Sequence, residues 1–237
     1  MSSKERKTEV RIDRREMCQL LAASPAAMAV LFSTAQGREE EIMSKRNAKR
    51  KILMPIGDGS EVLDTMYAYY RLGEEDDLEV VVAGPEARLY HLVIHEQPPN
   101  SDVPWDITRE LPGYHLKADI AFKDVRPAEY AGLYLSGGRA PEYIRNDEDL
   151  LNITRHFFKA GKPVASICHG IEILSAADCI RGCTVTTIPK CALDAKQGQA
   201  TYTGKPMEID GKLVSVRGKR DLSLLLKNFI KILNATS

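Results

Sequence analysis

Residues 161–174 read GKPVASICHGIEIL and combine a strand, a tight turn and the start of a helix. The β-rich part of this stretch stops abruptly at Cys168, and from Ile171 onward the apolar residues follow helical spacing. In such a turn the residue between strand and helix adopts a strained conformation that lifts its side chain clear of the sheet. Cys168 takes this place, and Gly170 is the small residue that lets the two backbones pass. We therefore expect Cys168 to be a nucleophile whose thiol pKa is lowered by the N-terminal end of the following helix.

Short apolar runs alternate with segments of helical spacing along most of the chain. The expected strands are residues 52–55, 78–83, 120–122, 133–135, 163–167 and 184–188, with a hairpin turn at Asp210-Gly211 before a strand at 213–216. The expected helices are residues 62–72, 147–160 and 222–233. This alternation indicates an α/β fold with a mostly parallel sheet and helices on both faces. In sheets of this type, sites lie beyond the carboxyl ends of the strands.

Composition limits the classes of protein and of partner. The chain has 237 residues, 43% of them hydrophobic, which is enough for one sizeable core with an appendage. Lys plus Arg and Asp plus Glu both number 33, so no charge bias indicates a nucleic-acid partner. The five cysteines are an odd number without CxxC pairs, so we expect free thiols, no structural metal site and no cofactor.

Residues 1–50 differ in composition from the rest and are predicted to be an extension to a domain at 51–237. A basic segment with Arg14-Arg15 precedes an apolar run that is too short and interrupted to span a bilayer. Small residues at 33–35 then complete the pattern of a twin-arginine-like export signal in residues 1–35. A docking helix is a second interpretation, and an untranslated segment before a natural start at Met43 is a third. The location therefore stays open between the cytoplasm and export, with no membrane partner expected.

Three loops after expected strands carry chemical groups, at residues 58–64, 137–141 and 168–170. The backbone amides of Gly138 and His169 can form an oxyanion hole. All five histidines lie at or before position 169, so the triads of an α/β-hydrolase or a class I glutamine amidotransferase, which need a later histidine, cannot be assembled. His169 is therefore the expected partner of Cys168, with a carboxylate from the first loop or from another subunit.

Two other groups of residues could carry chemistry. His91, His95 and Glu96 have a spacing that could ligate a metal, although we interpret them as polar side chains of an ordered insertion at about residues 87–112. Cys179 and Cys183 read as small core residues, whereas Cys191 follows a proline on an expected loop and could lie near the pocket.

The paired segments SGGRAPEYIR (136–145) and GKPVASICHG (161–170) resemble the ThiJ/PfpI family of intracellular PfpI-type peptidases and deglycase and glyoxalase-like proteins. The resemblance covers about residues 51–233 apart from the insertion. It implies a flavodoxin-like three-layer sandwich, similar to class I glutamine amidotransferases, with Cys168 as nucleophile, His169 as its partner and Gly138 and His169 amides as the oxyanion hole. In PfpI-type members the third catalytic residue is a glutamate of a neighbouring subunit. The matching position is Glu142, so the resemblance also implies a homo-oligomer, from dimer to hexamer.

One position departs from the family pattern. The family usually has a glutamate in the first loop that donates a hydrogen bond to the cysteine sulfur, and an ungapped reading puts Asp64 there. A carboxyl group buried beside a thiolate should have a raised pKa, so we expect Asp64 to be a protonated donor, with Glu61 as the alternative carboxylate. Glu172 stands where many relatives have glutamine, and we interpret it only as a favourable charge in the first turn of a helix.

The expected activity is addition of the Cys168 thiolate to an electrophilic carbonyl carbon. With a 2-oxoaldehyde this gives hydration to a hydroxy acid or deglycation, and with a peptide it gives hydrolysis. Trp105 in the insertion and His115 beyond it would shape the pocket. The alternative is a redox sensor or stress holdase in which Cys168 is oxidised and turnover is small. The adjacent imidazole favours catalysis, because a sensor does not need one.

Overall fold

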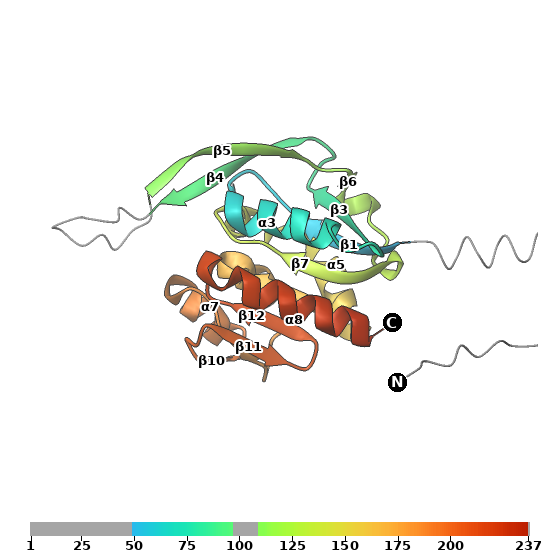
Figure 1. Cartoon of the computed structure of the whole chain (residues 1–237). Helices are drawn as coiled ribbons and strands as arrows, with labels where there is room; N and C mark the ends of the chain where they lie inside the picture. The colour runs from blue at the N-terminus through green and yellow to red at the C-terminus, as the bar shows by residue number, and fades with distance from the viewer. Residues whose placement is uncertain (1–48, 97–108, 237) are drawn as a thin grey trace, which may run out of the picture. The chain divides into compact units, whose positions relative to one another are not determined.

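The computed structural model describes residues 49–96 and 109–236, which are drawn in colour in Figure 1. The proposed interpretations of residues 1–48 and the expected role of Trp105 lie outside the described residues. In these two ranges no helix has both the length and the apolar character required to cross a bilayer.

The described chain is built around a seven-stranded sheet (Figure 1). Its strands, in the order of the sheet, are β11 (Met207–Asp210), β12 (Leu213–Val216), β8 (Val164–Ile167), β7 (Tyr130–Leu135), β1 (Arg50–Pro55), β3 (Leu78–Gly84) and β6 (Ile120–Ala121). Every neighbouring pair is parallel except β11 and β12, which form the hairpin expected at Asp210-Gly211. This confirms a mostly parallel, flavodoxin-like α/β sheet.

Helices cover both faces of this sheet, because alternate residues of a buried strand point to opposite sides. On β1, Ile52 and Met54 join one apolar cluster and Leu53 joins the other. The first cluster packs against α3 (Val62–Gly73) and α8 (Leu222–Ala235), which lie together on one side in Figure 1. The second packs against α4 (Ala140–Ile144), α5 (Glu148–Lys159), α6 (Ile171–Ala176) and α7 (Ala192–Gln197). Short 3-10 turns connect these elements: η1 (Phe122–Asp124), η2 (Pro127–Glu129), η3 (Cys168–Gly170), η4 (Pro189–Cys191) and η5 (Lys219–Asp221).

The stretch at residues 87–112, to which the sequence assigned no strand, contributes to a β-hairpin. The strands β4 (Leu89–Glu96) and β5 (Arg109–Lys117) pair antiparallel, and β2 (Ser60–Glu61) adds to β4 in parallel. The pattern was hard to recognise because β5 contains Pro112 and Gly113, which are rare inside strands, and the register shifts between His91 and Val93. This correction matters because β4 carries His95 to one wall of the pocket described below.

The expected strand at 184–188 is also shorter than predicted. Only β9 (Thr184–Val185) forms, and it pairs with β10 (Thr201–Tyr202) outside the main sheet. The next residues bond through side chains instead, since Thr186 N–H donates to Ser215 Oγ at 3.0 Å and Thr187 Oγ1 donates to the Cys168 carbonyl at 2.6 Å. These bonds hold the segment against the turn that carries Cys168.

Candidate active site

Cys168 lies at the turn between β8 and α6. Its φ of 55° is in the left-handed region, which costs an L-residue about 1–2 kcal/mol. Gly170 is needed for the close crossing, because a Cβ there would come within 2.6 Å of the Leu135 carbonyl oxygen. The bond from Thr187 Oγ1 to the Cys168 carbonyl oxygen then holds the turn. The strain is thus compensated by local contacts that keep the side chain raised at the carboxyl end of β8.

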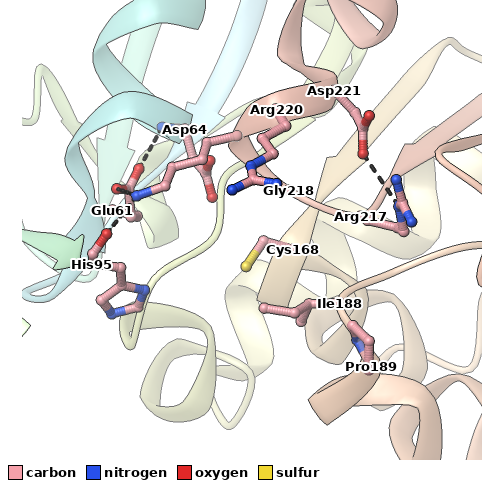
Figure 2. Close-up of a pocket in the computed structure, with 11 residues that line it drawn as sticks. Glu61, Asp64, His95, Cys168, Ile188, Pro189, Arg217, Gly218, Arg220 and Asp221 are labelled. Atoms are coloured by element: carbon pink, nitrogen blue, oxygen red, sulfur yellow. Dashed lines mark hydrogen bonds and ion pairs between the residues drawn. The ribbon is translucent and has the colours of Figure 1, made fainter. Parts of the chain in front are cut away.

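The Cys168 side chain borders a cavity of about 310 Å³ (Figure 2). The residue is only 6% exposed, so access to the sulfur is through this cavity. The backbone N–H groups of His169 and Gly138 both donate toward the sulfur. Gly138 reaches this orientation with a φ of +93°, at which an L side chain would be strained. These two amides are placed to receive negative charge that develops on or beside the sulfur.

The electrostatics of Cys168 differ from the expectation of a lowered thiol pKa. Burial raises the pKa of the Cys168 thiol, and the nearby carboxylate of Asp64 adds to the increase. The amides of His169 and Gly138 act in the opposite direction but do not outweigh burial. The helix that follows has only six residues, from Ile171 to Ala176. Burial therefore favours the thiol over the thiolate, so formation of a thiolate would need a nearby base to accept the proton.

Asp64 lies at the start of α3, on the other side of the space left by Gly137. A methyl group on Gly137 would come within 2.5 Å of Asp64 Oδ2 and 3.2 Å of Cys168 Sγ, so both groups face this gap. Burial raises the pKa of Asp64 well above 3.8, with the charge of Glu61 as the next cause. This shift favours the protonated form of Asp64, which can donate a hydrogen bond and does not repel a thiolate. Glu61, the alternative carboxylate, instead caps α3 by accepting from the Asp64 N–H at 2.7 Å.

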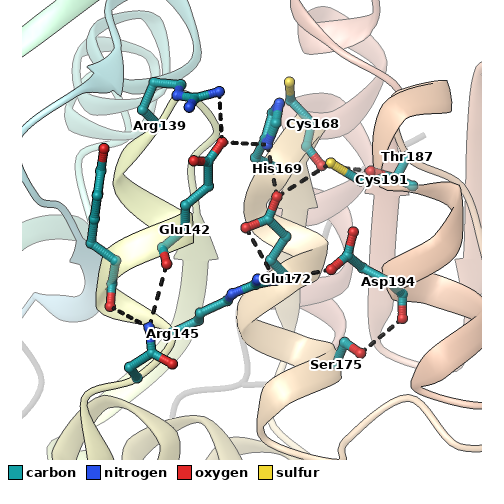
Figure 3. A network of polar contacts seen from close by, with 12 residues as sticks. Arg139, Glu142, Arg145, Cys168, His169, Glu172, Ser175, Thr187, Cys191 and Asp194 are labelled. Carbon is teal, nitrogen blue, oxygen red and sulfur yellow. Dashed lines mark hydrogen bonds and ion pairs between the residues drawn. The ribbon is translucent and has the colours of Figure 1, made fainter.

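The carboxylate that holds the His169 ring is Glu172. Its Oε1 lies 2.8 Å from His169 Nδ1, whereas Glu142 Oε1 lies 3.9 Å away and is paired with Arg139 at 2.8 Å (Figure 3). The sequence predicted only a favourable charge at the start of a helix for Glu172. In the structure its carboxylate also contacts the His169 ring. Glu142 approaches His169 within the same chain, so a neighbouring subunit is not required to bring a carboxylate to this ring. The spacing of three residues at a helix start, which places side chains on one face, was the available signal for Glu172.

Glu172 also joins a wider buried network in Figure 3. Its Oε2 lies 3.5 Å from Arg145 Nη1, which in turn pairs with Asp194 at 2.9 Å. The Cys191 thiol donates to Glu172 Oε1 at 3.5 Å, so Cys191 lies beside the partner of His169 and is not among the residues that line the cavity. Among the described residues, His169, Glu172 and Cys191 are the group whose ligand atoms, all within 4.8 Å of one another, could hold a metal. The hydrogen bonds between them already account for this proximity.

The structure does not bring together the three residues considered for a metal on the insertion. His91 Nδ1 lies 2.8 Å from His115 Nε2 across β4 and β5, on an exposed surface. His95 instead borders the cavity, where burial lowers its pKa and keeps the imidazole neutral. His115, which was expected to shape the pocket, is not among the described residues that line it.

The loop between β12 and α8 also borders the cavity, which the sequence did not predict. Arg217, Lys219 and Arg220 of this loop line the cavity together with His95. No local pattern indicates this arrangement, because the loop approaches Cys168 only after β12 pairs with β8.

Several known proteins are similar to this chain in sequence or in fold. The sequence pattern of the DJ-1/PfpI family matches residues 50–232. A curated deglycase of Thermococcus kodakarensis is 36% identical over 183 residues, which cover 77% of this chain and 99% of that protein. Deglycase PfpI of Pyrococcus furiosus is 34% identical with the same coverage. The crystal structure of Drosophila melanogaster DJ-1beta superposes with a TM-score of 0.61 at 17% identity, covering 78% of this chain and 91% of that one.

Proposed function

Because the chain belongs to the DJ-1/PfpI family, we propose that it is a cysteine-dependent enzyme that acts on small carbonyl compounds, as a 2-oxoaldehyde hydratase or deglycase. The observation that carries this proposal is a nucleophilic sulfur in a strained turn, facing a cavity together with two backbone amides and a protonated acid. The relatives from Thermococcus kodakarensis and Pyrococcus furiosus, each matched over 99% of its length, carry the name deglycase, which supports the same class of substrate.

The reaction begins with the Cys168 thiol. His169, oriented by Glu172, accepts the thiol proton as the sulfur attacks the aldehyde carbon of a 2-oxoaldehyde. A new S–C bond forms, and the carbonyl electron pair moves to oxygen, where the amides of Gly138 and His169 stabilise the charge. Asp64 donates a hydrogen bond on the other side of the sulfur.

Product formation requires no external oxidant. The hydrogen of the former aldehyde carbon leaves as a proton and returns to the neighbouring carbonyl carbon, which converts the hemithioacetal to the thioester of a 2-hydroxy acid. Water then cleaves the thioester and releases the acid and the free thiol, so the net change is addition of one water. With a hemiaminal formed from an amine and a 2-oxoaldehyde, the C–N bond breaks as the hydroxyl proton is transferred to nitrogen. The amine leaves, and the free aldehyde then follows the same path.

The cavity supports a small substrate over a peptide. Its volume of about 310 Å³ is at the lower end of the range of ligand pockets, roughly 300–1,000 Å³. A 2-oxoaldehyde of a few carbon atoms fits inside it. The redox-sensor interpretation is less well supported, because peroxide reacts with thiolates and burial raises the pKa of Cys168.

The test compares wild type, Cys168→Ser and His169→Ala with methylglyoxal and with a casein-derived peptide. We expect lactate from wild type, none from Cys168→Ser and a large loss in His169→Ala. Cys183→Ser is the matched control, since this half-buried thiol lies outside the cavity, and it should retain activity. Lactate formation that persists without the Cys168 sulfur would overturn the proposal, and peptide cleavage without lactate would replace it by a peptidase.

A further inference from the structure

We propose that the cavity selects carbonyl substrates that carry a negatively charged group, and that Arg220 binds this group. The inference rests on the proposed function for the reacting carbonyl and goes beyond it in naming the class of substrate. A carboxylate is the simplest such group, because it matches the planar fork of a guanidinium.

The loop of residues 217–220 brings three cations to the cavity, and two of them are already engaged. Arg217 Nε pairs with Asp221 Oδ2 at 3.4 Å. Lys219 Nζ donates to the His95 backbone carbonyl and lies 4.0 Å from Glu61 Oε1. Arg220 differs from both, because its guanidinium has no hydrogen bond or ion pair to any residue in the described parts of the chain.

The Arg220 side chain points into the cavity, so a bound substrate could supply the partner that its guanidinium lacks. Figure 2 shows its side chain reaching into the space between Asp64 and Cys168. The side chain is exposed, so water solvates it in the free protein and a ligand can replace that water.

The acids of the cavity do not neutralise Arg220. Glu61 faces Lys219 and Asp221 faces Arg217, while burial favours the neutral form of Asp64. One positive charge thus remains beside the sulfur. A substrate with a carbonyl at one end and a carboxylate at the other would place the first on Cys168 and the second on Arg220. The cavity of about 310 Å³ is large enough for a small molecule of this kind.

The first experiment measures charge selection without requiring turnover. Iodoacetate and iodoacetamide alkylate thiols with the same carbon skeleton, but only iodoacetate is charged. Mass spectrometry follows the alkylation of Cys168, and the quantity compared is the rate with iodoacetate divided by the rate with iodoacetamide. We expect this ratio to be about tenfold lower in Arg220→Gln than in wild type, because the variant loses one charge-assisted hydrogen bond. A change in the reactivity of the thiol itself affects both reagents and cancels in the ratio.

Arg126→Gln is the matched control. Arg126 is exposed and lies just before β7, at the opposite end of that strand from Gly138, so the alkylation ratio should equal that of wild type. A ratio in Arg220→Gln that equals wild type would overturn the inference, whether or not the protein turns over any substrate.

The second experiment compares 4,5-dioxopentanoate, a 2-oxoaldehyde with a carboxylate, with its uncharged amide. We expect wild type to prefer the carboxylate by about tenfold in kcat/KM. Arg220→Gln should lose this preference through a higher KM for the carboxylate, whereas any change in thiol reactivity affects both substrates equally. Arg220→Lys should retain part of the preference. Equal use of both substrates by wild type would refute the inference and leave the proposed function standing. Turnover of neither would refute the proposed function, and the alkylation ratio would still decide on the role of Arg220.

Discussion

The assignment of Glu172 as the residue that orients His169 leads to a quantitative prediction. Glu172→Gln keeps the shape of the side chain but removes its charge, and Glu172→Ala removes the contact. The protein should stay folded in both cases, because Arg145 keeps its pairing with Asp194 at 2.9 Å. The thermal unfolding midpoint reports this directly.

The magnitude follows from the 2.8 Å distance between Glu172 Oε1 and His169 Nδ1. A hydrogen bond to a charged group contributes about 1.5–3 kcal/mol, and one between neutral groups contributes about 0.5–1.5 kcal/mol. Loss of the whole contact in Glu172→Ala should therefore lower kcat/KM about 10- to 150-fold. The neutral replacement should lower it about tenfold, since each 1.36 kcal/mol corresponds to a factor of ten in rate.

Glu142→Gln is the matched control for the same chemistry. Its carboxylate lies 3.9 Å from His169 Nδ1 and is paired with Arg139 at a partly exposed position, so its loss should change kcat/KM less than about threefold. The assay is lactate formation from methylglyoxal, with Glu172→Asp as a partial rescue. A Glu142→Gln variant that loses as much activity as Glu172→Gln would refute the assignment and return the role to the residue that the family resemblance implied.

Three further predictions concern the buried groups of the site and the core. Burial raises the pKa of Asp64 above 3.8, so its contribution to stability is fully present below pH 3.8 and is lost as pH rises toward the folded value. Urea unfolding from about pH 4.5 to 8 should show wild type losing up to about 1.4 kcal/mol per pH unit relative to Asp64→Asn, and parallel curves would contradict this. Gly137→Ala should abolish most activity, by about a hundredfold or more in kcat/KM, because the new methyl would lie 2.6 Å from Cys168 Cβ; wild-type alkylation of Cys168 in this variant would show the reasoning to be wrong. Phe229→Ala, a fully buried residue of α8, should lower the free energy of unfolding by about 3–5 kcal/mol in urea titrations, and a loss below about 1 kcal/mol would mean that α8 is not packed on the sheet as described.

The fold could be predicted from the sequence because its determinants are short-range. The buried strands of the sheet and the apolar face of α8 follow directly from apolar spacing. The buried residues of that helix are Leu222, Leu225, Leu226, Phe229, Ile230 and Leu233. The turn at Cys168 was also recognisable, because a strand, a raised residue and a small spacer occupy neighbouring positions. The β4 and β5 hairpin was missed for the converse reason, since proline, glycine and an irregular register obscure its alternation.

The chemistry of the site depended on packing between segments far apart in the chain. The sequence, with the family resemblance, predicted a site that contains Cys168, His169 and Asp64. The expected rise in the pKa of Asp64 needed only the assumption that its carboxyl group is buried beside a sulfur. The choice of Glu172 over Glu142, the raised pKa of Cys168 and the approach of Arg220 to the cavity were decided by tertiary structure. Hydrogen bonding, desolvation and charge pairing change over distances of one or two ångströms. Such distances are set only when β7, β8, β12 and the helices on both faces pack together.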